Sequence, residues 1–532
     1  MAPAPQGFRQ SMAWLHTWCG LVCGWLLCAI FLTGTLSVFR EPITRWMEAR
    51  PPATPVPGAA GGASDAALQA AARHLAAHGA GARFWRIELP REPGDALRLA
   101  WPPAAGAHGG PQTAALDPAS GALLPAPWGR RTEGGRHFMT FHYTLHGGVP
   151  GYWLVGWLSV GMLVALVSGV VVHRRIFADF FTFRPAKGQR SWLDAHNATA
   201  VLALPFLFMI VYTGLAIFYT SYLPWPLRAV YGADGAAHGR FQQELTHQAP
   251  PMRRARSGTA APLHGLAPLL AQAQALTGQP PRLVVVEQPG DAAMVVRIHT
   301  RASGDPRTLH QAVGSVAFDG VDGAVLQVQR PLADATPASA QAHGVMAALH
   351  LAHFGGWTIK WLYFFSGLAG TAMMATGTIL FGIKRRRKAG KESSPATPWA
   401  YRAAEALNVA ALAGTAVACI AYLWCNRLLP ADLPGREAWE IRGFLCAWLA
   451  AALHAACRPA ARAWVEQLSA AAVLCLALPL LNQWTTGQQA WRHALAGDWQ
   501  QAGVELVALG FGVALAWGAW QVRRALRKGI PG

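Results

Sequence analysis

Long apolar stretches separated by polar segments dominate this chain of 532 residues. A helix needs about 20 apolar residues to cross the hydrocarbon core of a bilayer. Eight stretches meet that requirement, at residues 14–39, 152–172, 193–218, 357–383, 403–425, 441–457, 463–481 and 502–521. The pattern therefore predicts a mainly α-helical membrane protein with about eight transmembrane helices, in contact with the lipid bilayer.

Two long polar segments, residues 41–140 and 224–343, interrupt the apolar pattern. Each contains a helical stretch followed by short alternating strands on either side of a Pro-Gly-Asp-Ala turn. Strands bounded by Gly and Asp turns are typical of hairpins, so each segment is predicted to form a small α+β module.

The order span, module, span occurs twice in the same direction. This duplication predicts a first repeat at 8–190, a second repeat at 191–390 and a four-span extension at 400–532.

Charge fixes the expected orientation. The net charge is +19, and the basic residues cluster in the connections after spans two, four, six and eight. Because cytoplasmic loops carry an excess of Lys and Arg, both termini are expected in the cytoplasm and both modules outside. Basic residues beside apolar runs do not form the soluble basic face of a nucleic-acid-binding protein.

All eight Cys lie in or next to apolar runs, so the modules are not disulfide scaffolds.

Seven histidines lie near the ends of the first four spans, where ionisable groups are costly and more often functional. His16, His173 and His196 lie at the cytoplasmic ends, whereas His142, His146, His350 and His353 precede the outward ends. Each of these spans also carries a hydroxyl–glycine pair. His16 and His196 each precede such a glycine by 18 residues, and His142 and His350 each precede one by 27.

Facing imidazoles on neighbouring helices are typical ligands of haem b. The duplication predicts two haems, one near each membrane face. His16 and His196 are expected to bind the inner haem, and one of His142 or His146 with one of His350 or His353 the outer haem. His173, whose place in the second repeat is taken by Phe381, is an alternative inner ligand. A copper or zinc site is the alternative, although carboxylate and extra-membrane Cys ligands are missing nearby.

Length sets a constraint on these ligands. His146 and His173 are 27 residues apart, which is about 40 Å along a helix and more than the hydrocarbon core of about 30 Å. We therefore expect one of two arrangements. Either each haem lies closer to the membrane centre than its ligands, or the helix breaks at Pro150 and Gly151 and folds His142 and His146 back.

Four motifs together resemble the PepSY-associated transmembrane family, and within it the branch of inner-membrane ferric-siderophore reductases. They are Trp14–Trp18 (WLHTW), Ser168–Phe177 (SGVVVHRRIF), Ser191–Asn197 (SWLDAHN) and Leu349–Gly356 (LHLAHFGG). The resemblance covers residues 8–390. It implies that the histidines of the family motifs correspond to His16, His146, His173, His196, His350 and His353. His142 fits the set by its spacing.

The resemblance implies a bacterial inner-membrane reductase whose periplasmic PepSY modules meet a ferric siderophore, with electrons from quinol or a cytoplasmic reductase. Two alternatives stay open. One is a non-enzymatic PepSY protein that binds peptide or regulates a protease, and the other is a metal-handling membrane protein. Transport is disfavoured because the first four spans hold no internal Asp or Glu relay.

Overall fold

A computed structural model describes residues 7–92, 94–104, 110–173, 184, 188–246, 252, 254–301, 309, 313–331, 338–389 and 398–528. Three of the expected cytoplasmic basic residues, Arg174, Arg175 and Lys187, lie outside the described residues, as do the side chains of residues 385–388.

The eight predicted spans are confirmed, and the chain is a multi-pass membrane protein. In the described part of the chain, eight helices are long and apolar enough to cross a bilayer. The first four are α1 (Phe8–Ser37), α5 (Gly148–Val172), α7 (Gln189–Ile217) and α13 (Gly356–Ala389). The others are α14 (Pro398–Val409) joined to α15 (Thr415–Leu428) by the π-helical turn Ala410–Gly414, then α16 (Arg436–Cys457), α17 (Ala460–Thr486) and α19 (Trp499–Arg527).

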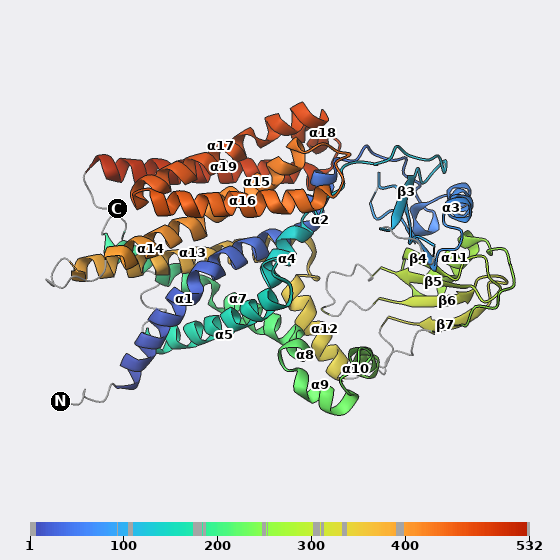
Figure 1. Ribbon diagram of the computed structural model, residues 1–532, viewed down its shortest axis with the longest axis horizontal. Helices are drawn as coiled ribbons and strands as arrows, with labels where there is room; N and C mark the ends of the chain where they lie inside the picture. Colours follow the sequence, from blue (N-terminus) through green and yellow to red (C-terminus); the bar gives the residue numbers. More distant parts are fainter. Residues whose placement is uncertain are drawn as a thin grey trace.

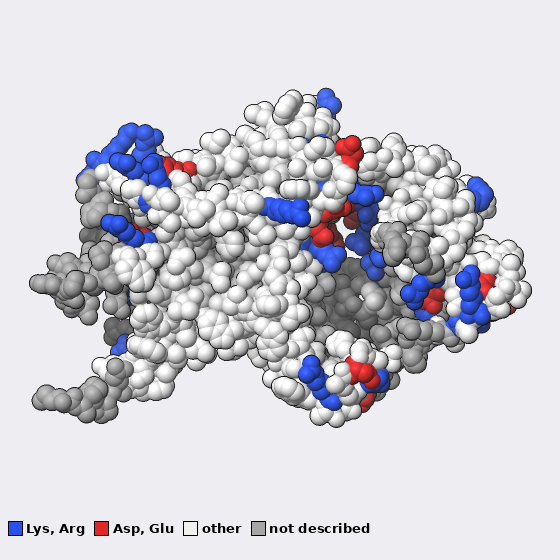
Figure 2. Space-filling model, viewed as in Figure 1, with Lys and Arg blue, Asp and Glu red and all other residues white. Residues whose placement is uncertain are grey.

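The spanning helices run side by side, and the strands gather at one end of them (Figure 1). Short helices surround that end: α2 (Arg40–Glu48), α4 (Arg136–Thr144), α8 (Tyr219–Tyr222), α9 (Pro224–Tyr231), α10 (Ala237–Thr246), α12 (Ala338–Leu351) and α18 (Ala490–Leu495). Lys and Arg side chains also gather at the opposite end, near the C-terminus (Figure 2).

The two predicted modules share one seven-stranded sheet, with strand order β3-β2-β1-β4-β5-β6-β7. The first contributes β1 (Phe84–Glu88), β2 (Leu97–Trp101) and β3 (Gln112–Leu116), and the second β4 (Pro281–Glu287), β5 (Val295–Thr300), β6 (Ser315–Asp319) and β7 (Val325–Gln329). The modules join where β1 pairs antiparallel with β4, so two strands that would otherwise be edges satisfy each other's backbone groups.

The helices of both modules cover the same face of this sheet. They are α3 (Asp65–His78) and α11 (Leu266–Thr277), and a 3-10 turn at Ala60–Gly62 precedes α3. Side chains alternate along a strand, so Ile87, Val284 and Val296 are buried against the helices. The opposite face of the sheet carries charged side chains, among them Arg86, Glu88 and Arg98.

The expected helix break exists, but its predicted position at Pro150 and Gly151 is wrong. The chain turns between α4 and α5, where Leu145 and His146 take left-handed conformations with φ of 52° and 54°. Pro150 lies in the first turn of α5, which tolerates proline because backbone N–H groups there have no helical partner. Gly151 lets α5 pack closely on α4, since a methyl group there would overlap the Thr144 carbonyl oxygen.

Candidate functional site

Four of the seven predicted histidines share one hydrogen-bond geometry. The Nδ1 atoms of His16, His142 and His196 each lie 2.8 Å from a backbone carbonyl oxygen, and that of His350 lies 2.9 Å from one. The carbonyls belong, in that order, to Ala165, Ile30, Met373 and Ile210. A carbonyl only accepts, so Nδ1 carries the proton and Nε2 keeps its lone pair. None of the four Nε2 atoms has a hydrogen-bond partner among the described residues.

The hydroxyl–glycine pairs explain this repeated geometry. Each accepting carbonyl lies four residues before the glycine of a pair, and the Nδ1–Cε1 edge of the imidazole lies against that glycine. A Cβ on Gly169, Gly34, Gly377 or Gly214 would come within 2.9, 2.6, 3.0 or 2.7 Å of the facing histidine ring. Only glycine leaves room for the ring.

The hydroxyl of each pair donates its shortest hydrogen bond to the carbonyl just before the one that the histidine uses. Thr33 Oγ1 donates to the Ala29 carbonyl at 2.8 Å, and Thr376 Oγ1 donates to that of Ala372 at 2.7 Å. Ser168 and Thr213 donate in the same way, at 2.6 and 2.7 Å, and all four hydroxyls also lie within 3.2 Å of the histidine's own acceptor. The carbonyl and the glycine therefore fix one imidazole at each of four positions, as orienting partners do for metal-bound histidine.

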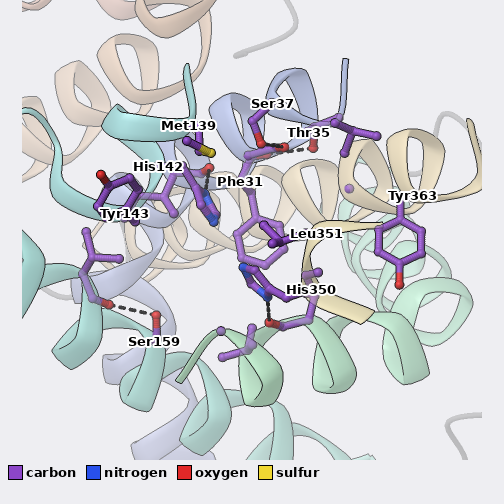
Figure 3. A pocket seen from close by; sticks show the side chains of 18 of the residues that line it. Phe31, Thr35, Ser37, Met139, His142, Tyr143, Ser159, His350, Leu351 and Tyr363 are labelled. Carbon is purple, nitrogen blue, oxygen red and sulfur yellow. Dashed lines mark hydrogen bonds between the residues drawn. The ribbon is translucent and has the colours of Figure 1, made fainter. Parts of the chain in front are cut away.

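The four histidines form two opposed pairs. The ring centres of His16 and His196 are 6.3 Å apart, and those of His142 and His350 are 6.1 Å apart. The rings of His142 and His350 point toward each other across a cavity (Figure 3). Two imidazoles bound to opposite sides of one metal ion, through bonds of about 2 Å, have ring centres roughly 6 Å apart. Each pair takes one histidine from each repeat.

The other three predicted histidines lie outside these pairs. His146 follows the turn after α4, and its Nε2 lies 2.9 Å from Nδ1 of His137, against which its ring stacks. His353 Nε2 lies 3.4 Å from a guanidinium nitrogen of Arg40. His173 ends α5, and its backbone N–H donates to the Gly169 carbonyl.

Both pairs fit within the thickness of a bilayer. His142 binds the carbonyl of Ile30 on α1, the helix that carries His16. Fourteen residues separate His16 from Ile30, which corresponds to about 21 Å at 1.5 Å per residue. The stretch from His146 to His173 is longer than the hydrocarbon core, but this does not affect the outer pair. That pair uses His142, which the turn after α4 folds back beside α1.

The cavity between His142 and His350 has a volume of about 120 Å³ and a largely apolar, aromatic wall. Phe31, Phe206 and Tyr363 contribute to the wall, and Arg40 lies at the cavity as well. Apolar and aromatic walls around two opposed imidazoles suit a planar aromatic cofactor.

The donor set distinguishes between metal sites. Among the described residues, His, Cys, Asp and Glu side chains nowhere gather in threes as a metal-binding group. Structural zinc takes four protein ligands and catalytic zinc three, so two imidazoles alone do not make such a site. A metal whose other ligands come from a macrocycle needs only the two, and the residues present therefore fit haem.

The four-span C-terminal unit contacts two segments that precede His142 in the chain. Fully buried Arg427 lies over the Trp46 ring at 3.7 Å and donates to the Met47 carbonyl. Arg436, also fully buried, donates to the Arg131 carbonyl at 2.6 Å and pairs with Glu440. These contacts fix the end of α2 and the approach to α4, which carries His142.

Sequence reasoning missed the Nδ1 acceptors, His137 and this buried ionic network. The sequence contains a signal for the acceptors, because all four lie four residues before the glycine of a hydroxyl–glycine pair. His137 and the network had none, since their contacts join residues roughly 300 positions apart or follow from the turn after α4.

These features define a class: a multi-pass membrane protein with two repeated units that jointly position paired histidines beneath a shared extramembrane sheet. The chain matches the model of the PepSY-associated TM region over residues 13–384. That match covers more than half of the chain, so the protein belongs to the PepSY-associated transmembrane family. A search of curated proteins finds no match to it.

Proposed function

We propose that the protein is a haem-b oxidoreductase that moves electrons across the bacterial inner membrane and reduces ferric-siderophore iron on the periplasmic side. The observation that carries this proposal is the presence of two opposed imidazole pairs with matching Nδ1 hydrogen bonds. When bound, haem b supplies a one-electron carrier. Ferric iron that gains one electron becomes ferrous iron, which a siderophore holds less tightly.

The chain's own residues orient the ligands and exclude water. The Ala165, Ile30, Met373 and Ile210 carbonyls hold each ring in the tautomer that leaves the Nε2 lone pair free to bind a metal. The separation of roughly 21 Å between the pairs along α1 supports the proposal of one haem near each face of the membrane. This arrangement supports transfer from a cytoplasmic or membrane donor, either a reductase or quinol, to an acceptor outside.

The proposed orientation places the sheet in the periplasm and both termini in the cytoplasm. It is supported by basic residues at the membrane end opposite the sheet, including Arg462 in the first turn of α17 and Arg523 and Arg524 near the end of α19. Cytoplasmic ends carry such an excess of Lys and Arg.

An absorption spectrum of the purified full-length protein tests the proposal. We expect a Soret band and, after dithionite reduction, sharp α and β bands, with two haems per chain. His16→Ala and His196→Ala should each remove one haem, and His142→Ala and His350→Ala the other. A folded but colourless preparation would contradict the proposal and leave the non-enzymatic PepSY alternative.

A further inference from the structure

A small pocket lies where the two modules join, and half of its lining residues are arginines. Its cationic lining is Arg50, Arg86, Arg91, Arg98 and Arg282, and its acidic lining is Glu88 and Asp95. The pocket has a volume of about 30 Å³. A buried site holds one water once about 10–15 Å³ is available, so this pocket has room for a group the size of a carboxylate.

The pocket opens on the side of the sheet that faces the membrane helices. Trp85 and Ile87 of β1 point into the core beneath α3 and α11, so Arg86 points to the other face. On that face Arg98 lies 3.9 Å from Glu48 of α2, and Arg91 lies 3.7 Å from Glu41 of the same helix.

The carboxylates around the pocket are shared, and they leave arginine in excess. Glu88 serves both Arg86 and Arg98, each at 2.6 Å. Among the described residues, Arg282 has no carboxylate within 4 Å. Burying cationic groups without a partner is costly. Burial, together with Arg91 nearby, lowers the pKa of Arg282. Arg50 differs, because it pairs with Glu48 of α2.

We propose that this pocket binds the carboxylate or phosphate group of an anionic ligand, with Arg282 and Arg86 as its principal donors. The planar guanidinium group matches two oxygens of either anion. Both repeats are needed, since Arg86 lies on β1 and Arg282 within β4.

The inference rests on the proposed function and specifies its substrate class as an anionic ferric chelate. α2 connects the two sites directly. Arg40, its first residue, lines the cavity of the outer histidine pair, and Arg50, two residues beyond its end, lines the arginine pocket. A helix of nine residues is about 13 Å long, so a chelate anchored by one carboxylate lies within a short reach of the outer pair.

Calorimetric titration of the oxidised, detergent-purified full-length protein tests the pocket. The probes are citrate, inorganic phosphate and short-chain phosphatidylglycerol, each titrated separately. We expect citrate binding that weakens with salt. Arg282→Gln should lower citrate affinity at least about tenfold, the effect of losing a hydrogen bond to a charged group, while Arg282→Lys should lose less. Arg73→Gln, an exposed position on α3, is the matched control and should bind like the wild type.

Equal citrate affinity in wild type and Arg282→Gln, or an equal loss in Arg73→Gln, would overturn the proposal. If Arg282→Gln fails to fold, Arg86→Gln provides the same comparison. If Arg282→Gln loses phosphatidylglycerol binding but not citrate binding, the site binds the anionic headgroup of a lipid. The proposal that its ligand is a ferric chelate would then be wrong. The titration needs no haem and no electron donor. A colourless protein that binds citrate through Arg282 would therefore refute the haem proposal without refuting the site.

Discussion

Gly34→Ala provides a direct test of how the outer histidine pair is held. The added Cβ would stand 2.6 Å from Nδ1 of His142, whereas carbon atoms rest about 3.5–4.0 Å from their neighbours. The ring must therefore retreat by roughly 1 Å. Its hydrogen bond to the Ile30 carbonyl, now 2.8 Å, would stretch beyond the usual limit of about 3.2 Å.

Two costs add up in this variant. Overpacking a tight contact costs about 1–3 kcal/mol, and the lost hydrogen bond costs about 0.5–1.5 kcal/mol. More important, a ring displaced by roughly 1 Å would no longer hold Nε2 where a metal ion shared with His350 would need it. We therefore expect Gly34→Ala to lose the outer haem and to keep the inner one.

The haem content per protein, measured as the pyridine haemochrome, should fall by about half, and one of two reduced α-band components should disappear. Gly20→Ala is the control, because it lies on the same helix and a Cβ there meets no atom within 4 Å. A Gly34→Ala protein with full haem content and an unchanged spectrum would refute the packing argument. So would an equal loss in Gly20→Ala.

Three further predictions concern other parts of the chain. His146→Ala should keep full haem content, since His146 contacts His137 rather than the opposed pairs. A spectrum showing the loss of one haem would instead identify His146 as a haem ligand. Asp117→Asn should destabilise the sheet by about 1–2 kcal/mol near neutral pH. Burial raises the pKa of Asp117, but hydrogen bonds from Ser120 and Thr54 outweigh this effect and lower it to about 2. Because the folded pKa is below the unfolded value of about 3.9, this stability is present above pH 4 and disappears as the pH falls toward 2. Thermal unfolding followed by Trp fluorescence should therefore show a gap from wild type that closes in acid, and a constant gap would contradict the assignment. Glu440→Gln should leave Arg436 buried without its partner and cost about 3–5 kcal/mol, and an unchanged unfolding temperature would contradict it.

Much of the membrane architecture could be predicted from the sequence because hydrocarbon imposes a length on each apolar run. The spans and the duplication follow from patterns within about 30 residues. The fusion of the modules into one sheet could not be predicted, since the pairing of Trp85 with Val286 depends on two strands roughly 200 residues apart.

The outer pair illustrates the same limit at the level of one residue. His142 and His146 are one helical turn apart, and the sequence allowed either to face His350. The left-handed turn at Leu145 and His146 decides between them, because it ends α4 and turns His146 toward His137. A left-handed conformation at Leu is uncommon, so no local signal marks it.

The composition of the two pairs has a consequence for how the protein can be divided. Each pair joins one histidine from residues before 190 with one from residues after it, so neither half holds a complete site. Two separately expressed fragments, cut between α5 and α7, would each be unable to bind haem between paired imidazoles. The two fragments would have to associate before either site existed, through the pairing of β1 with β4 and through contacts between their spanning helices. Cofactor binding would then report the reunion of the fragments.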